Sequence, residues 1–145
     1  DQAESMGLPR TPQPWFEEPT KGEKLRLLSP ASFWRMNDSY SNDANIHERS
    51  GEAKILVSPV DAVELNISDG ATVEILNDTG TIQLIASIDD RVLPKTLVSY
   101  KGRWPSIESS GRNINFVHKA KMSDMGNSSS VHSTEVILRV IPKHA

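Results

Sequence analysis

Short apolar segments recur between residues 24 and 141, and in several of them apolar and polar residues alternate. Alternation with a period of two, bounded by turn residues, is typical of a β-strand with one buried face. The pattern predicts strands at 24–29, 54–57, 71–76, 81–88, 96–100 and 134–141. Six or so short strands in one small domain favour a β-barrel of mixed topology.

One segment carries the signals of a helix. Ser58 can cap a helix, Pro59 suits the first helical position, and Asp61 favours the first turn through its charge. We therefore expect a short helix from Ser58 to about Asn66. The chain then turns into the clearest hairpin of the sequence, which bends back at residues 77–80.

Two stretches, residues 31–52 and 101–133, are polar and show no clear period. Serine, asparagine, aspartate and glycine dominate them, which indicates loops on the surface or over a ligand. Loops of this length in a small domain are usually functional or disordered.

The first 22 residues contain four prolines among polar residues. Because proline fixes φ and lacks a backbone donor, residues 1–22 are predicted to form an extended linker that enters a domain at 23–145. Within the linker, Trp15 and Phe16 are expected to pack on the domain or on a neighbouring part of a longer protein. The start at Asp1, which is not a methionine, also leads us to expect a fragment of a longer polypeptide.

Composition excludes several classes of function. The formal net charge of −3, with both signs mixed along the chain, argues against nucleic-acid binding. The chain has no cysteine, which excludes disulfides, iron–sulfur clusters and thiolate zinc sites within it. No apolar run reaches the roughly 18 to 20 residues that span a bilayer, and we expect no membrane contact by this domain.

The sequence offers neither a metal site nor a catalytic group. The internal histidines His47, His118 and His132 lack the close spacing of metal ligands and are expected in loops or at the surface. The serine-rich segments 109–110 and 128–130 lack the strand–turn–helix motif of a serine nucleophile.

Several segments, taken in order, carry a resemblance to a known family. They are Leu27-Leu28-Ser29-Pro30, the polar segment 37–42, the capped helix and its Asp-Gly turn at 57–73, and the segments 79–82, 91–96, 100–104 and 113–117. Over about residues 24–142 the chain resembles the molybdopterin dinucleotide-binding domain that closes the catalytic subunits of the dimethyl-sulfoxide-reductase superfamily. Because other double-psi barrels share the segment 57–73, the expected cofactor rests on the loops and on the order of all segments.

The resemblance implies a mainly β fold, a double-psi-type, six-to-seven-stranded barrel of the aspartate-decarboxylase kind with one or two short helices. It implies the carboxy-terminal domain of a bacterial oxidoreductase, similar to formate dehydrogenases and nitrate reductases, that is inactive alone. This domain would help bind a bis(molybdopterin guanine dinucleotide) cofactor with molybdenum or tungsten. The metal ligand and any iron–sulfur cysteines would lie upstream, in the rest of the catalytic subunit. We expect a cytoplasmic enzyme, although superfamily members also work in the periplasm.

The family pattern also implies eight candidate contacts to the cofactor. They are Ser32, Arg35, Asn37 and Ser39 in the first loop, and Tyr100, Lys101, Arg103 and Asn115 in the second region. Hydroxyl, amide and guanidinium groups suit the phosphates and the heterocycle edges of a dinucleotide. Each residue also has an interpretation without the cofactor. The first-loop side chains would be solvated, the segment around Arg103 would be a surface turn anchored by Trp104, and Asn115 would form an Asx-turn.

The chain departs from the family pattern at three positions. Family members usually have glycine where Asn66 and Lys95 stand, and threonine or serine where His118 stands. Asparagine tolerates a left-handed backbone better than most residues, so the change at Asn66 is easily accommodated.

Two other functions remain possible from the sequence. A free-standing double-psi barrel that binds a protein or peptide would need a complete start and a self-sufficient surface. A self-processing decarboxylase-like barrel would need a Gly-Ser dipeptide near its early strands, and the chain has none.

Overall fold

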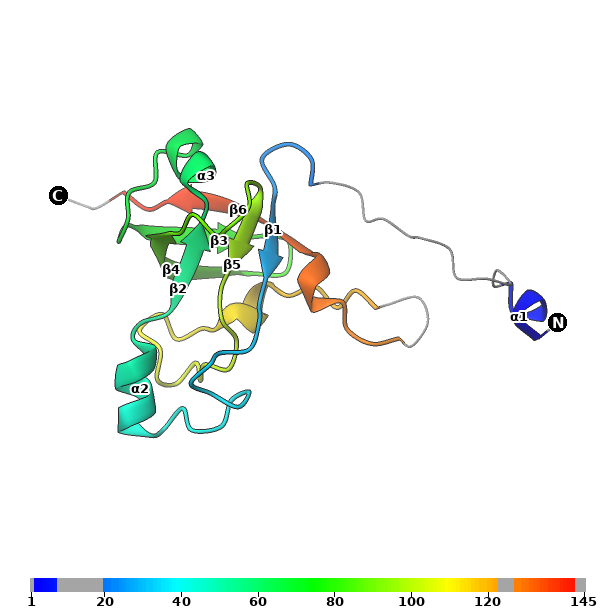
Figure 1. Cartoon of the computed structure of the whole chain (residues 1–145), viewed down its shortest axis with the longest axis horizontal. Helices are drawn as coiled ribbons and strands as arrows, with labels where there is room; N and C mark the ends of the chain where they lie inside the picture. The colour runs from blue at the N-terminus through cyan, green and yellow to red at the C-terminus, as the bar shows by residue number, and fades with distance from the viewer. Residues whose placement is uncertain (1, 8–19, 123–126, 143–145) are drawn as a thin grey trace.

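The computed structural model describes residues 2–7, 20–122 and 127–142. Within these ranges six strands close into a barrel in the order β1-β5-β2-β4-β3-β6 (Figure 1). The strands are β1 (Leu25–Leu28), β2 (Lys54–Val57), β3 (Thr72–Leu76), β4 (Thr81–Ile88), β5 (Thr96–Val98) and β6 (Thr134–Val140). All six predicted strands are therefore confirmed, although β5 ends two residues earlier than the pattern suggested.

The barrel mixes parallel and antiparallel pairs, as predicted. β1 runs parallel to β5, and β2 runs parallel to β4. The other four neighbouring pairs are antiparallel. Since every strand has a partner on both sides, no strand edge among the described residues is left open.

Alternate strand positions fill the barrel interior. In β3, and in β4 as far as Ala86, every second residue is buried, which is the period that the sequence displayed. Leu25, Leu27, Val73 and Ile75 are among the fully buried side chains. Because burying one such side chain contributes roughly 1.5–3 kcal/mol, the apolar interior is the main force that holds the barrel closed.

Helix α3 (Pro59–Glu64) begins where the sequence predicted it. Ser58 Oγ accepts a hydrogen bond of 3.1 Å from the Asp61 backbone N–H. Asp61 does more than favour the helix dipole, because its buried carboxylate also accepts hydrogen bonds of 2.8 Å from Ser58 Oγ and from the Lys95 backbone N–H. This contact ties α3 to the turn before β5.

Asn77 organises the hairpin between β3 and β4. Its Oδ1 accepts hydrogen bonds from the backbone N–H groups of Thr79 and Gly80. Its Nδ2 donates to the carbonyl oxygens of Val117 and Glu135, at 2.7 and 3.2 Å. The predicted turn is therefore confirmed, and it also anchors the second loop and β6.

The prediction of continuous loops was wrong in part. Residues 44–50 of the first loop form helix α2 (Ala44–Ser50), which Asp43 caps by accepting a 3.0 Å hydrogen bond from the Ile46 N–H. The helix has no buried residue, so it lacks the apolar period that would have revealed it. The second loop contains two 3₁₀ turns, η1 (Ile114–Val117) and η2 (Val131–Ser133).

The predicted linker is described only at its two ends. A single helical turn, α1 (Gln2–Ser5), occupies part of its start, where an extended chain was expected. Trp15 and Phe16 lie outside the described residues. Among the residues that are described, no helix is long and apolar enough to cross a membrane.

Candidate functional site

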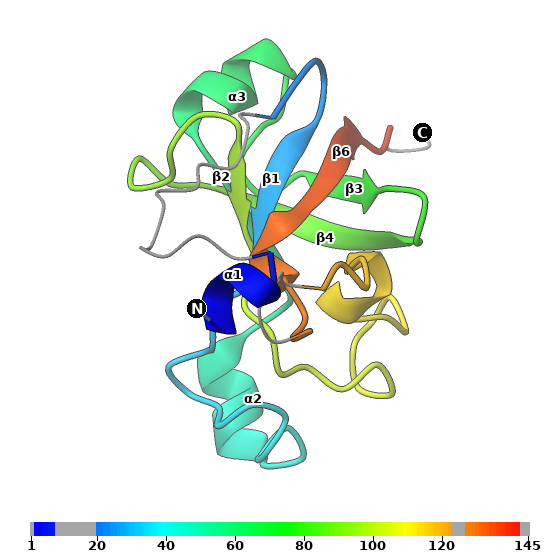
Figure 2. The ribbon, with the colours of Figure 1, turned by 90° about the vertical axis from the view of Figure 1, so that its right-hand side faces the viewer.

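The two long loops lie at one end of the barrel. β1 and β5 are parallel, so the segments that follow them leave at the same end. β2 is antiparallel to β5, and β4 is parallel to β2, so both of these strands begin at that end. Figures 1 and 2 show α2 and the loops at this end of the barrel and α3 at the opposite end.

Hydrogen bonds from side chains to backbone carbonyls join the two loops into one surface. Ser41 Oγ donates a 2.9 Å hydrogen bond to the Gly102 carbonyl oxygen. The indole Nε1 of Trp104 donates a 2.7 Å hydrogen bond to the carbonyl oxygen of Asp38. The first loop is therefore held against the segment that follows β5 at two points.

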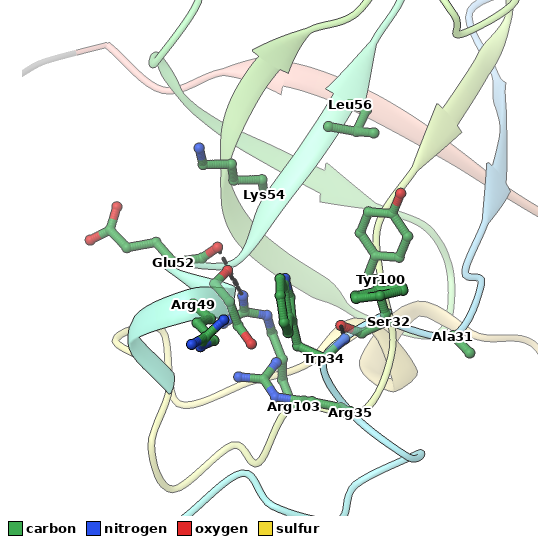
Figure 3. Close-up of a pocket in the computed structure, with 12 residues that line it drawn as sticks. Ala31, Ser32, Trp34, Arg35, Arg49, Glu52, Lys54, Leu56, Tyr100 and Arg103 are labelled. Atoms are coloured by element: carbon green, nitrogen blue, oxygen red, sulfur yellow. Dashed lines mark hydrogen bonds between the residues drawn. The ribbon is translucent and has the colours of Figure 1, made fainter. Parts of the chain in front are cut away.

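A pocket of about 500 Å³ opens between the loops, α2 and the start of β2 (Figure 3). The side chains that matter for its chemistry are Ser32, Trp34, Arg35, Arg49, Lys54, Tyr100 and Arg103. This volume lies within the range of roughly 300–1,000 Å³ that is common for small-molecule sites.

Arg103 holds the pocket wall together. The residue is only 9% exposed, and its Nη1 donates to both carboxylate oxygens of Glu108 at 2.9 and 3.1 Å. Its Nη2 donates to the carbonyl oxygens of Ser50, Gly51 and Glu52 at 2.8–3.1 Å. A guanidinium at the carboxyl end of a helix satisfies free carbonyl groups and complements the helix dipole. These donors are engaged within the protein and hold α2 to the second loop.

Arg35 differs from Arg103 in that its buried guanidinium is not fully hydrogen-bonded by the residues that the structure describes. It is 6% exposed, and its Nε is buried without a hydrogen-bond partner in the described part of the chain. Burial lowers the pKa of the guanidinium, the neighbouring positive charge of Arg103 lowers it further, and Glu108 offsets part of this effect. Arg35 is therefore a buried cation in an unfavourable environment at the pocket wall, where an anion would stabilise it.

The remaining charges around the pocket are mostly positive. Arg49 and Lys54 add two cations, and Glu52 is the one acidic side chain among the described residues that line it. Arg103 is already paired with Glu108. The pocket therefore has an excess of positive charge that suits a ligand with phosphate groups.

Exposed aromatic rings line the same pocket. Phe33 is 89% exposed and Trp34 is 39% exposed, and their rings meet edge to face with centroids 4.9 Å apart. The guanidinium carbon of Arg49 lies 5.1 Å from the centroid of Trp34. The cavity thus combines positive charge with apolar ring surface.

A second cluster joins the end of β1 to the second loop. Ser29 Oγ and His118 Nε2 are hydrogen-bonded at 2.9 Å, and the Ser29 backbone N–H donates to His132 Nδ1 at 3.3 Å. Burial lowers the pKa of His118, and the charges of His132 and Lys101 lower it further. No group of three or more potential metal-ligating side chains occurs in the described ranges.

Comparison with known proteins identifies the family. Residues 25–135 match the family described as the Molydopterin dinucleotide binding domain. The chain belongs to this family. The family match confirms the resemblance that the sequence displayed, and molybdopterin dinucleotide binding is the function that the family describes.

Two curated relatives are similar over part of the domain. The "Probable oxidoreductase YoaE" of Bacillus subtilis (strain 168) is 30% identical over 101 residues, which are 70% of this chain and 15% of that protein. The dimethyl sulfoxide/trimethylamine N-oxide reductase of Cereibacter sphaeroides is 31% identical over 81 residues, 56% of this chain and 9% of that protein. The domain therefore corresponds to a small part of these relatives.

A solved structure supports the fold. The acetylene hydratase from Pelobacter acetylenicus superposes with a TM-score of 0.76 at 15% identity, over 94% of this chain and 22% of that chain. At this identity the likeness shows the fold alone. Together with the closed six-stranded barrel, it confirms the predicted double-psi-type architecture.

The residues of the molybdopterin dinucleotide-binding domain fit such a cofactor. A dinucleotide carries phosphates, which need positive charge, and planar heterocycles, which need ring surface and hydrogen-bonding groups. The pocket offers the unpartnered Nε of Arg35, two further cations and exposed aromatic rings. The orphaned donor of Arg35 is the strongest of these features because burial without a partner is unfavourable.

The structure brings four of the eight predicted contact residues together. Ser32, Arg35, Tyr100 and Arg103 line the pocket. The other four, which are Asn37, Ser39, Lys101 and Asn115, lie in the adjoining loops and outside the pocket lining. Asn115 is exposed on η1, where its backbone N–H donates to Asn113 Oδ1 in an Asx-turn made by the Asn113 side chain, so the role of the Asn115 side chain stays a prediction.

Sequence reasoning missed several residues of the pocket. Arg49 was missed because α2, which carries it, showed no helical period. Lys54 was assigned only to a strand. Phe33 and Trp34 are two large aromatic residues in a polar loop, and this contrast was a signal that they contact a ligand or a neighbour.

Proposed function

We propose that this domain holds a molybdopterin guanine dinucleotide through the pocket at the loop end of its barrel. It would act as the carboxy-terminal part of a molybdenum or tungsten oxidoreductase and share a bis-dinucleotide cofactor with the rest of that protein. The domain itself contributes binding and positioning, and it has no catalytic residue of its own.

Arg35 carries this proposal. A guanidinium that is 6% exposed, next to a second arginine and with a buried Nε that lacks a partner, is unfavourable unless an anion approaches it. A diphosphate supplies that anion and accepts the free donor. Arg103 cannot take this role without giving up five hydrogen bonds to Glu108 and to the end of α2.

The other pocket residues would support Arg35. Arg49 and Lys54 add positive charge for phosphate oxygens, and the hydroxyl groups of Ser32 and Tyr100 can hydrogen-bond to heteroatoms of the cofactor. When bound, the cofactor supplies the redox chemistry, and the protein supplies its orientation and its electrostatic environment. Contacts from Asn37, Ser39, Lys101 and Asn115 remain predictions.

The nature of the whole protein is a further part of the proposal. The relatives include a probable oxidoreductase and a sulfoxide and N-oxide reductase, which supports a terminal reductase. The formate dehydrogenase or nitrate reductase type expected from the sequence stays a prediction. A bacterial origin and a cytoplasmic location stay predictions. The substrate depends on residues around the metal, which this domain does not contain.

The test is the cofactor content of the full-length protein that carries this domain. The full-length protein is purified from a host that assembles molybdenum enzymes, and a known molybdenum enzyme from the same cells serves as a control. We expect molybdenum or tungsten together with pterin and two guanine nucleotides per metal atom. A protein that lacks metal, pterin and nucleotide, while the control enzyme is loaded, would contradict the proposal and favour a protein-interaction module.

A further inference from the structure

Trp34 is placed unusually for a large aromatic residue. It lies in a polar loop, lines the 500 Å³ pocket and is 39% exposed. The described residues leave this part of the Trp34 surface uncovered, and Phe33, which meets Trp34 edge to face, is itself 89% exposed. Two adjacent aromatic side chains that face a cavity are typical of a surface that another ring covers.

Arg49 fixes one side of the Trp34 ring. Its guanidinium carbon lies 5.1 Å from the ring centroid, which is the geometry of a cation–π contact. In Figure 3, Tyr100 lies on the side of Trp34 away from Arg49, with the pocket around them. Arg49 therefore packs against the Trp34 ring at the edge of the pocket.

Trp104, the other tryptophan at this end of the barrel, has a different environment from Trp34. Trp104 does not line the pocket, and its Nε1 donates to the carbonyl oxygen of Asp38, which gives it a structural role. No hydrogen bond of the Trp34 indole is found among the described residues. Its ring contacts Arg49 and Phe33, and the part of it that stays exposed lines the cavity.

We propose that Trp34, backed by Arg49, is the platform on which a planar, nitrogen-rich heterocycle of the bound dinucleotide stacks, either its guanine or its pterin. Arg35 lies next to Trp34 in the chain and lines the same pocket, so one short segment provides both a stacking surface and a cation for the diphosphate. This inference rests on the proposed function and adds to it the residue that positions a ring.

The experiment measures how long the full-length protein retains its guanine nucleotide, and it compares two replacements of similar size. Trp34→Phe keeps an aromatic ring, whereas Trp34→Leu keeps apolar bulk without one. Loss of the aromatic ring removes the binding free energy that base stacking contributes. Converted to a rate, this loss should make Trp34→Leu release the nucleotide roughly 5- to 150-fold faster. Trp34→Phe should stay close to the wild type. Met36→Ala, at an exposed residue of the same loop outside the pocket lining, is the matched control and should not change release.

A fluorescence measurement separates stacking from a merely structural role. The difference between wild-type and Trp34→Phe spectra isolates the emission of Trp34. Its quenching by acrylamide should be weaker in the loaded protein than in apoprotein from cells that cannot make the cofactor. If guanosine diphosphate alone protects Trp34 in the apoprotein, the ring is guanine, and if only the intact cofactor does so, it is the pterin.

Two outcomes would overturn the inference, and they are distinguishable. If Trp34→Leu releases nucleotide as slowly as the wild type while Arg35→Met releases it quickly, stacking on Trp34 is excluded and the proposed function stands. If the wild-type protein purifies without nucleotide, the proposed function fails and the stacking inference fails with it.

Discussion

Gly102 and Asn37 lie so close together that no side chain fits at position 102. A Cβ atom built on Gly102 would lie 1.8 Å from the carbonyl oxygen of Asn37, and the glycine has a φ of +92°. Asn37 itself has a φ of 56°. The first loop and the segment after β5 therefore meet backbone to backbone, and this contact sets the shape of the pocket wall.

Gly102→Ala should separate the two loops. The methyl group would meet a backbone oxygen, which cannot move as a flexible side chain can, and the positive φ adds strain of order 1–3 kcal/mol. We expect a loss of thermal stability together with faster release of the guanine nucleotide. Gly111→Ala is the control, since Gly111 also has a positive φ, of +65°, but its Cβ would meet nothing within 4 Å. Equal effects of the two substitutions on nucleotide release would show that the close approach does not matter.

Arg103 and Glu108 should behave as a structural pair. Arg103→Met would leave the buried carboxylate of Glu108 without its partner, and breaking a buried pair in this way costs about 3–5 kcal/mol. The double variant Arg103→Met with Glu108→Gln should lose much less stability than the sum of the single variants. Urea unfolding of the four proteins measures the coupling. Additive losses would indicate that the two residues act independently.

The barrel could be predicted from the sequence because its elements carry their own signals. The alternating residues of β3 and β4, the Ser58 cap and the Asn77 turn all act locally, and all appear in the structure as expected. Helix α2 was not predictable, because none of its residues is buried and its stability comes from the Asp43 cap and from contacts with Arg103.

Lys95→Gly should stabilise the domain. Lys95 has a φ of 62°, a conformation that a lysine adopts with strain and that glycine adopts freely. Its backbone N–H, which donates to Asp61, is kept, and its exposed ion pair with Glu64 contributes little. After the entropic cost of glycine in the unfolded chain, we expect a gain of about 0.5–1 kcal/mol by urea unfolding. Asn66→Gly, at a φ of 53°, should change less, because asparagine already tolerates this backbone. A destabilised Lys95→Gly variant would contradict this account of why the family favours glycine there.

Stability should fall as the pH drops below about 6.5, in part because of His118. Burial, His132 and Lys101 lower the pKa of His118 from its ordinary value of 6.5. The unfolded chain then binds a proton at a higher pH than the folded chain does, so acid favours unfolding from about pH 6.5 downward. His118→Gln keeps a group that can hydrogen-bond to Ser29 and does not titrate. We expect its melting temperature to depend less on pH between 7 and 5 than that of the wild type, and an unchanged pH dependence would exclude His118 as a contributor.

The pocket could be predicted only in outline. The family pattern pointed to Ser32, Arg35, Tyr100 and Arg103, and the structure places all four around one cavity. The pattern could not separate the roles of the two arginines, since both are cations in polar loops. Only the three-dimensional structure shows that Arg103 is engaged by Glu108 and α2, whereas Arg35 has a buried Nε without a partner.

The most direct test of the account is to replace Arg35 in the full-length protein and to measure both stability and bound guanine nucleotide. Because burial and Arg103 make its charge unfavourable in the fold, Arg35→Met should leave the apoprotein at least as stable as the wild type. The same variant should lose most of its guanine nucleotide during purification, and Arg35→Lys should retain an intermediate amount. Full nucleotide occupancy in a well-folded Arg35→Met protein would contradict the claim that this pocket holds the cofactor.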